Sequence, residues 1–217
     1  MHTTVTVARM TVTARDRVAA GFADFDAADS PAEPKILRRQ LFHYHDELLI
    51  QVVDSDAPPV EFAEQRDGAP TGPELTTELS GYDGAATPFR PAAQRYYHWL
   101  PGPVHPSMYS TLVVNRLTPA RRPQVASLFA DFDTTEVPHR MGTRRRQLFA
   151  YSGVYFHLQD FETPDGGEVI AQAWKQADPR FIQICDDLDP LIEKYDVATW
   201  RKPADAVAQR FYHWEKA

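Results

Sequence analysis

The chain has 217 residues, 43% of them hydrophobic and 12% aromatic, which is enough apolar material for two modest cores. Its formal net charge of -7 argues against a nucleic-acid surface, which needs a basic stripe. No stretch approaches the roughly 20 apolar residues of a membrane span, and the amino terminus lacks a signal-peptide pattern. The single cysteine, Cys185, cannot form an internal disulfide, which favours a cytoplasmic location and a packing role for its thiol.

The dominant feature of the sequence is an internal repeat. Residues 7–44 align without a gap on residues 114–151 and are identical at 18 of 38 positions. The end of each copy is repeated too, because QRYYHW at 94–99 corresponds to QRFYHW at 209–214. A repeat of about a hundred residues is large enough to form a small domain. We therefore predict two related domains, residues 1–104 and 105–217.

The second copy gives the clearer pattern of elements, and the first copy follows the same order. In the first copy, Asp54 to Thr87 is rich in Pro, Gly, Asp and Thr and is predicted to be a loop. In the second copy we predict strands at 110–116, 143–151, 154–160 and 208–214, helices at 119–133 and 179–195, a tight turn at Ser152-Gly153, and a loop around 164–167. The order β-α-β-β-α-β is that of ferredoxin-like domains.

Strand alternation predicts which groups each sheet face presents, because successive side chains point to opposite sides. Both faces of the 143–160 hairpin carry large apolar groups, such as Leu148 on one face and Phe149 on the other. Helices cover only one face of a ferredoxin-like sheet. We therefore expect an α+β fold in which the two ferredoxin-like domains pack sheet to sheet, as an intramolecular version of a dimeric α/β barrel.

Three polar residues of the second copy are candidates for catalysis. Arg146 and His157 lie on adjacent strands with the same facing, and Asp133 ends the first helix of the copy. An imidazole or carboxylate base beside a guanidinium suits proton abstraction next to a carbonyl, because the guanidinium stabilises the developing enolate. From spacing alone, a structural Arg146–Asp133 ion pair with a core histidine is the alternative.

The same region resembles the tetracenomycin-type aromatic polyketide cyclases. The resemblance is carried by FADFDTTEVPHRMGTRRRQLF (129–149), VYFHLQDFE (154–162), FIQICDDLDPLIEKY (181–195) and FYHW (211–214). It implies a ferredoxin-like, normally dimeric fold and a cofactor-independent aldol-type cyclisation with dehydration. It places the family's aspartate, arginine and histidine on Asp133, Arg146 and His157, while Phe132 replaces a further family histidine. The segment MGTRRRQ (141–147) is similar to the corresponding segment in the angucycline branch of this family.

The first copy resembles the family less closely. It keeps Asp26 and Arg39, but Ile50 is expected where the second copy has His157. Its own candidate imidazoles are His43 and, in the hairpin turn, His45. Either this copy holds an altered second site or it is a degenerate scaffold. The residues expected to contact substrate are Phe129, Phe132, Tyr155, Trp174 and Phe211, together with Arg39, Asp26 and His43 of the first copy.

These features predict a cytoplasmic polyketide cyclase acting on a poly-β-ketone or partly cyclised aromatic polyketide. His157 is expected to act as the base, Arg146 to anchor the enolate and Asp133 to orient them. We expect no cofactor and no metal, since neither a dinucleotide fingerprint nor zinc-ligand spacing is present. The expected partners are the substrate and a polyketide synthase or tailoring enzyme, with the chain a pseudo-dimeric monomer or a homodimer. A cofactor-free quinone-forming monooxygenase and a non-catalytic polyketide-binding protein are the alternatives.

Overall fold

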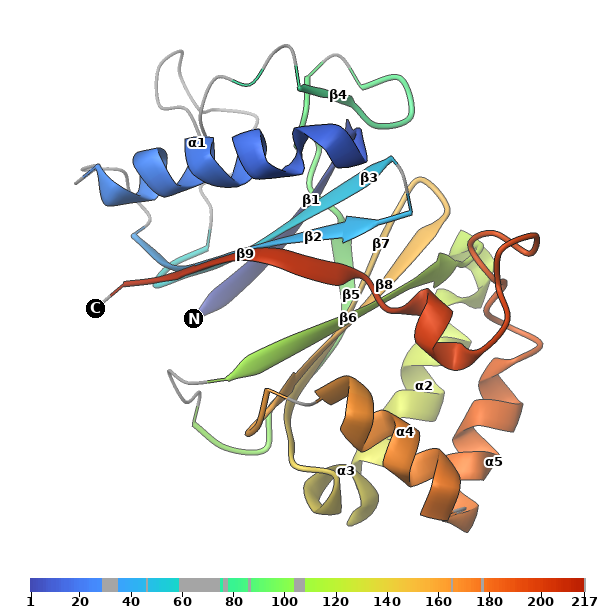
Figure 1. Cartoon of the computed structure of the whole chain (residues 1–217). Coiled ribbons are helices and arrows are strands. Elements are labelled where there is room, and N and C mark those ends of the chain that lie inside the picture. The colour runs from blue at the N-terminus through green and yellow to red at the C-terminus, as the bar shows by residue number, and fades with distance from the viewer. Residues whose placement is uncertain are drawn as a thin grey trace. The chain divides into compact units, whose positions relative to one another are not determined.

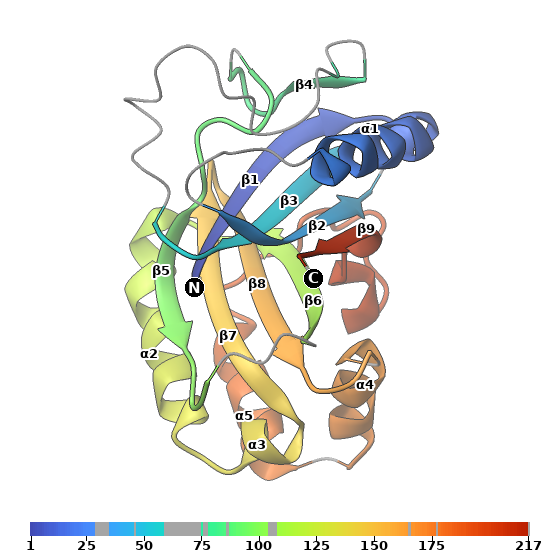
Figure 2. The same cartoon turned by 90° about the vertical axis from the view of Figure 1, so that its left-hand side faces the viewer.

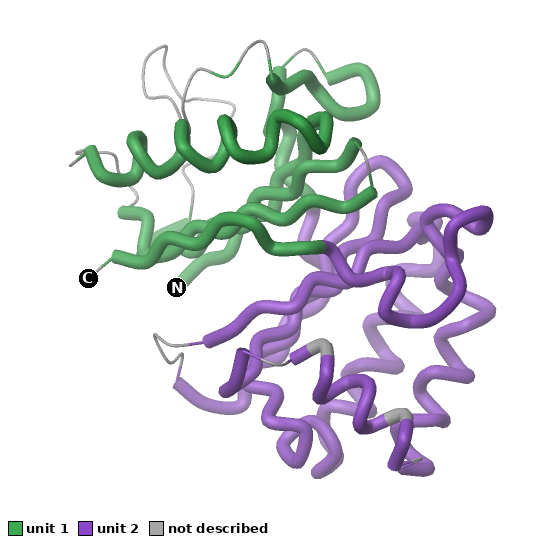
Figure 3. Tube along the Cα trace, viewed as in Figure 1, with its two compact units in different colours: residues 1–93, 209–217 green, residues 94–208 purple. Residues whose placement is uncertain are grey.

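The computed structural model describes residues 1–28, 35–45, 47–58, 75, 78–85, 87–103, 108–164, 166–176 and 178–216 (Figure 1). The chain divides into two compact units (Figure 3). Unit 1 comprises Met1–Ala93 and Gln209–Ala217, and unit 2 comprises Gln94–Ala208. Within the described part, no helix combines the length and the apolarity needed to cross a membrane.

Unit 1 is an antiparallel sheet with a helix on one face (Figure 1). Its strand order is β4-β1-β3-β2-β9. Val18 and Phe22, one helical turn apart on α1, pack against Leu41 and Leu49 of the sheet, and all four are fully buried. The elements of unit 1 are β1 (His2–Met10), a 3-10 turn (Val12–Ala14), α1 (Arg15–Ala27), β2 (Ile36–Tyr44), β3 (Leu48–Ser55), β4 (Leu79–Gly81) and β9 (Gln209–Glu215).

Unit 2 is a four-stranded antiparallel sheet of order β5-β7-β8-β6, with α2 and α5 side by side on one face (Figure 2). Val125 and Phe129 of α2 and Ile184 of α5 pack against Leu148 and Tyr155 of the sheet. The elements of unit 2 are β5 (Gln94–Trp99), β6 (Tyr109–Arg116), α2 (Arg122–Asp133), α3 (Val137–Arg140), β7 (Thr143–Tyr151), β8 (Val154–Phe161), α4 (Gly166–Gln176) and α5 (Pro179–Leu188), with 3-10 turns at Pro119–Arg121 and Pro203–Ala206.

The last strand of each sequence copy belongs to the sheet of the other copy. β5 closes the first copy but pairs with β7 in unit 2, and β9 closes the second copy but pairs with β2 in unit 1 (Figure 3). The compact units therefore differ from the predicted division at residues 104 and 105. The physical reason is that β2 and β7 share the sequence RRQLF, so nothing local indicates which of these edges a final strand joins.

Most of the predicted elements of the second copy are confirmed, and so are the α+β class and the ferredoxin-like order. The hairpin 143–151 and 154–161 matches the prediction to within one residue. One expected element differs in length, and one helix was not expected. The final helix ends at Leu188, because Pro190 cannot continue a helix and disfavours it at the preceding residue. The segment after the predicted loop forms helix α4, since good helix formers follow Gly166.

The predicted loop Asp54 to Thr87 is also wrong at two places. Asp54 and Ser55 complete β3, and Leu79–Gly81 forms the edge strand β4 beside β1. Residues 59–74, 76, 77 and 86 of that stretch lie outside the described residues. The face-to-face packing of the two sheets stays a prediction.

The two central hairpins have turns of different length. Ser152 and Gly153 link β7 to β8 with φ of 47° and 78°, the positive values that a two-residue hairpin turn requires. Three residues, 45–47, link β2 to β3. The offset between the copies is therefore 107 before the hairpin turn and 106 after it. Consequently Gln51, opposite Leu41, is the counterpart of His157, opposite Leu148.

Candidate active site

Arg146 is the centre of a buried polar cluster in unit 2. It lies on β7, and its Nε donates to both carboxylate oxygens of Asp133, each at 3.0 Å. Asp133 is the last residue of α2, and that helix covers the same sheet face. Arg146 is 3% exposed and Asp133 is 4% exposed. The predicted convergence of these two residues is therefore present.

Two side chains of β8 complete the surroundings of the Arg146 guanidinium. Its Nη1 lies 2.7 Å from Nε2 of His157 and donates to Oε1 of Gln159 at 3.3 Å. Gln159 in turn donates to the hydroxyl of Thr143 at 2.7 Å, and both of these residues are buried. His157 is half-buried. An arginine can only donate, so Nε2 of His157 accepts and its single ring proton lies on Nδ1.

The pKa values of two side chains in the cluster, His157 and Asp133, are shifted from their ordinary values. Burial, and then the neighbouring Arg146, lower the pKa of His157 well below its ordinary value, so the imidazole is neutral. Burial raises the pKa of Asp133, while Arg146 and a hydrogen bond from Tyr97 act in the opposite direction. The carboxylate therefore depends on its two donors to remain ionised.

Tyr97 is a member of the cluster that the sequence reasoning missed. It lies on β5 opposite Leu148, and its hydroxyl donates to Oδ2 of Asp133 at 2.8 Å. A signal was present, because both copies of the terminal motif carry a tyrosine at this place, Tyr97 and Tyr212. Gln159 and Thr143 were missed as well. Neither residue type stands out in a strand unless its neighbours are known.

Three of the aromatic residues that were expected to contact substrate, Phe129, Phe132 and Tyr155, lie beside Arg146 or His157. The Arg146 guanidinium lies over the rings of Phe129 and Phe132, 4.8 and 5.6 Å from their centroids. The His157 ring centroid is 4.9 Å from that of Phe129 and 6.3 Å from that of Tyr155. Trp174 lies in α4, but its side chain is outside the described part of the chain.

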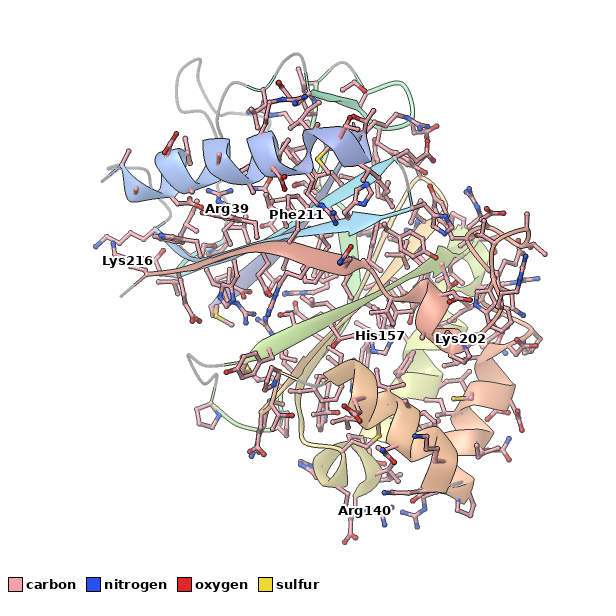
Figure 4. All side chains as sticks on the ribbon, in the orientation of Figure 1. Arg39, Arg140, His157, Lys202, Phe211 and Lys216 are labelled. Carbon is pink, nitrogen blue, oxygen red and sulfur yellow. The ribbon has the colours of Figure 1, made fainter. Side chains whose placement is uncertain are left out.

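Phe211 does not belong to this cluster, which corrects the prediction that it lines the site of His157. It lies on β9, which pairs with β2, and it packs against the core of unit 1. Figure 4 labels Phe211 and Arg39, which are both residues of unit 1, and His157, which is a residue of unit 2. The exchange of terminal strands is the reason for the difference.

Unit 1 contains a counterpart of the cluster without the histidine. Nε of Arg39 donates to both oxygens of Asp26 at 3.0 Å, and the hydroxyl of Tyr212 donates to Oδ2 of Asp26 at 2.8 Å. At the position of His157 stands Gln51, whose amide oxygen accepts from Thr6 at 3.2 Å. Ile50 was expected at this position, but the longer hairpin turn places it on the opposite face. Of the predicted first-copy residues, Arg39 is fully buried, and His43 is buried on β2 opposite Leu49.

The comparison with known protein families matches both copies of the repeat. The family model described as polyketide synthesis cyclase matches the chain twice, at residues 2–100 and 109–215. The chain belongs to the polyketide synthesis cyclase family. The two matches cover both sequence copies, so this cyclase-family chain is a tandem member.

Individual relatives each correspond to about half of this tandem cyclase-family chain. An uncharacterized protein of Streptomyces coelicolor is 41% identical over 110 residues, which are 50% of this chain and 96% of that protein. Tetracenomycin F2 cyclase of Streptomyces glaucescens is 35% identical over 106 residues, 49% of this chain and 94% of the relative. The crystal structure of an anthrone oxidase-like protein aligns with 99% of this chain, over 93% of the length of that protein's chain, with a TM-score of 0.55. Its identity is 9%, so that likeness concerns the fold alone.

Proposed function

We propose that the chain catalyses cofactor-free, aldol-type ring closure and dehydration of a partly cyclised aromatic polyketide, at the Arg146 cluster of unit 2. Membership of the polyketide synthesis cyclase family supports the reaction class. The single observation that carries the assignment is the contact of Arg146 with His157, because it joins a fixed cation to a neutral base.

The charge state of His157 suits the removal of a proton from carbon. Its lowered pKa keeps Nε2 unprotonated at neutral pH, and the carbon between two carbonyls of a β-diketone is already acidic. When a substrate carbonyl oxygen accepts from Nη1 of Arg146 in place of His157, the lone pair of Nε2 becomes available. The carbon–hydrogen bond then breaks, the proton moves to Nε2, and the enolate oxygen stays hydrogen-bonded to Arg146.

The same pair can complete the dehydration. The enolate carbon attacks a second carbonyl of the chain, which forms the ring bond and leaves an alkoxide. The His157 imidazolium lies beside the Arg146 cation in a buried surround, so it is a strong acid. It gives its proton to the alkoxide, which becomes a hydroxyl group. The neutral imidazole then takes a second proton from the carbon that attacked, the carbon–oxygen bond breaks as the carbon–carbon double bond forms, and His157 returns this proton to the departing hydroxide. The net products are one new ring and one water molecule.

Asp133 and the phenylalanines support Arg146 in this role. The Asp133 carboxylate binds Nε, so the Nη1 side of the guanidinium is directed toward β8. Phe129 and Phe132 lie against the guanidinium, and their low polarity strengthens its interaction with an enolate relative to water. Holding the chain in a reactive conformation also contributes to ring closure.

We assign the reaction to unit 2 and a structural role to the cluster of unit 1. Gln51 cannot accept and return a proton as an imidazole can, and its amide oxygen is bonded to Thr6. Arg39 and the side chain of Asp26 are almost completely buried as an ion pair.

The test is product analysis with a purified, partly cyclised polyketide intermediate, with and without the protein, while dissolved oxygen is recorded. The expected result is an accelerated formation of a product that has lost water, without oxygen uptake. Oxygen uptake matched to a quinone product would replace this proposal with a monooxygenase. Tight substrate binding with no change in the rate of ring closure would replace it with a polyketide-binding protein.

A further inference from the structure

We propose that Tyr97, which the sequence assigns to the first copy, is a positioning residue for the reaction in unit 2. It holds the Asp133 carboxylate in the orientation that fixes Arg146 beside His157. This inference rests on the proposed function. It means that the active site is built from both copies, because β5 brings Tyr97 into the sheet that carries Arg146.

The need for Tyr97 follows from the location of Asp133. This carboxylate is buried at the C-terminal end of α2, where the negative end of the helix dipole disfavours a negative charge. The groups that face it are Arg146 from β7, Tyr97 from β5 and His139 from α3. Of these, Arg146 and Tyr97 donate hydrogen bonds to its oxygens. Oδ2 of Asp133 accepts from both the Tyr97 hydroxyl and Nε of Arg146, so removal of the hydroxyl leaves Nε as the donor to this oxygen.

The hydroxyl also affects the direction of the Arg146 side chain. Nε of Arg146 lies 3.0 Å from both oxygens of the Asp133 carboxylate, so the carboxylate is oriented with its two oxygens equally distant from Nε. Tyr97 binds one of those oxygens from the neighbouring strand and so restricts rotation of the carboxylate. Because the same guanidinium contacts His157, a rotation of Asp133 changes the distance between Nη1 and Nε2.

Unit 1 supplies a matched control for this role. Tyr212 donates to Asp26 at 2.8 Å, the same distance as between Tyr97 and Asp133, and Asp26 binds Arg39 as Asp133 binds Arg146. The two tyrosines therefore make the same structural contribution to their units. The two clusters differ on the neighbouring strand, where Gln51 and Val53 of unit 1 stand in the places of His157 and Gln159 of unit 2.

The experiment compares Tyr97→Phe with Tyr212→Phe in the full chain. We expect Tyr97→Phe to lower kcat about tenfold or more, because a hydrogen bond to a charged group is lost. We also expect the acid limb of its pH–rate profile to move to higher pH, since Asp133 loses a donor that stabilises its ionised form. Tyr212→Phe should keep the wild-type rate and profile, while both variants lower the thermal unfolding midpoint to a similar degree.

A second measurement does not depend on turnover. In protein labelled with ¹³C at aspartate carboxyls, Asp133 should titrate at higher pH in Tyr97→Phe than in wild type. Equal activity losses in the two variants, or an unchanged rate and an unchanged Asp133 titration in Tyr97→Phe, would overturn the positioning role. A wild-type protein without cyclase activity would overturn the proposed function, and the titration would then decide whether Tyr97 holds Asp133.

Discussion

His157 accepts a hydrogen bond through Nε2 from Nη1 of Arg146 at 2.7 Å, so its own proton lies on Nδ1. Burial, and then the permanent cation at this distance, lower the pKa of the imidazole, so it is neutral. A neutral histidine beside an arginine can combine a base with an oxyanion-stabilising group, and of the two clusters described, that of unit 2 contains the histidine.

Replacement of His157 by asparagine should remove proton transfer and leave the cluster folded. The asparagine amide oxygen can still accept from Arg146, but it cannot carry a proton between carbon and hydroxyl. We expect kcat to fall roughly a hundredfold or more, the usual contribution of a general acid–base group. Steady-state kinetics of His157→Asn beside the control Gln51→Asn measure this. A full rate in the first variant, or an equal loss in the control, would contradict the role of His157.

Stability should fall as the pH is lowered through the titration of histidine in the unfolded chain. The pKa of His157 is lowered in the folded state, whereas it is about 6.5 in the unfolded state. Between these values the unfolded chain binds more protons, so the free energy of unfolding rises with pH. The stabilising contribution is complete above about pH 6.5 and is lost as the pH falls toward the folded-state pKa.

Urea unfolding between about pH 7.5 and about pH 5 tests this dependence. Burial lowers the pKa of His98 and His213 as well, and both contribute with the same sign. The informative quantity is therefore the difference between wild type and His157→Asn. The variant should lose less stability on acidification, and an identical pH dependence of the two proteins would argue against a depressed pKa at His157.

The exchange of terminal strands predicts which core mutation loosens which strand. Phe22 belongs to the core of unit 1 and Phe129 to that of unit 2, and truncating a buried phenylalanine to alanine costs about 3–5 kcal/mol. Phe22→Ala should accelerate amide hydrogen exchange in β9 together with β2. Phe129→Ala should instead accelerate exchange in β5 together with β7. Mass-spectrometric exchange that followed the sequence copies, with β9 responding to Phe129→Ala, would contradict the observed pairing.

Cys185 should be a slowly reacting thiol without a part in catalysis. It is partly buried on α5 against the core of unit 2, and burial, reinforced by Asp186, raises its pKa to about 12. Little thiolate forms at neutral pH, so a disulfide reagent should modify it more slowly in the folded than in the urea-unfolded protein. Rapid modification of the native protein, accompanied by loss of activity, would show that the thiol has a function.

Much of the candidate site could be predicted because its elements obey local rules. Alternation along the hairpin places Arg146 and His157 on one face, and the helical spacing of Val125 and Phe129 turns α2 toward that face and brings Asp133 with it. Gln159 and Thr143 could not be predicted, since their role is visible only in the hydrogen bonds that connect them to Arg146.

The repeat in the sequence and the alternation of side chains along each strand could be read from neighbours along the chain, and they established two related copies and the residues that share a strand face. Pairing between distant strands sets which sheet receives each final strand, and with it the partners of Tyr97 and Tyr212. It also decided that Gln51, not Ile50, stands opposite Leu41 in the first copy. Strand pairing joins residues far apart in the chain, and β2 and β7 both contain RRQLF, so this local sequence does not distinguish the two edges.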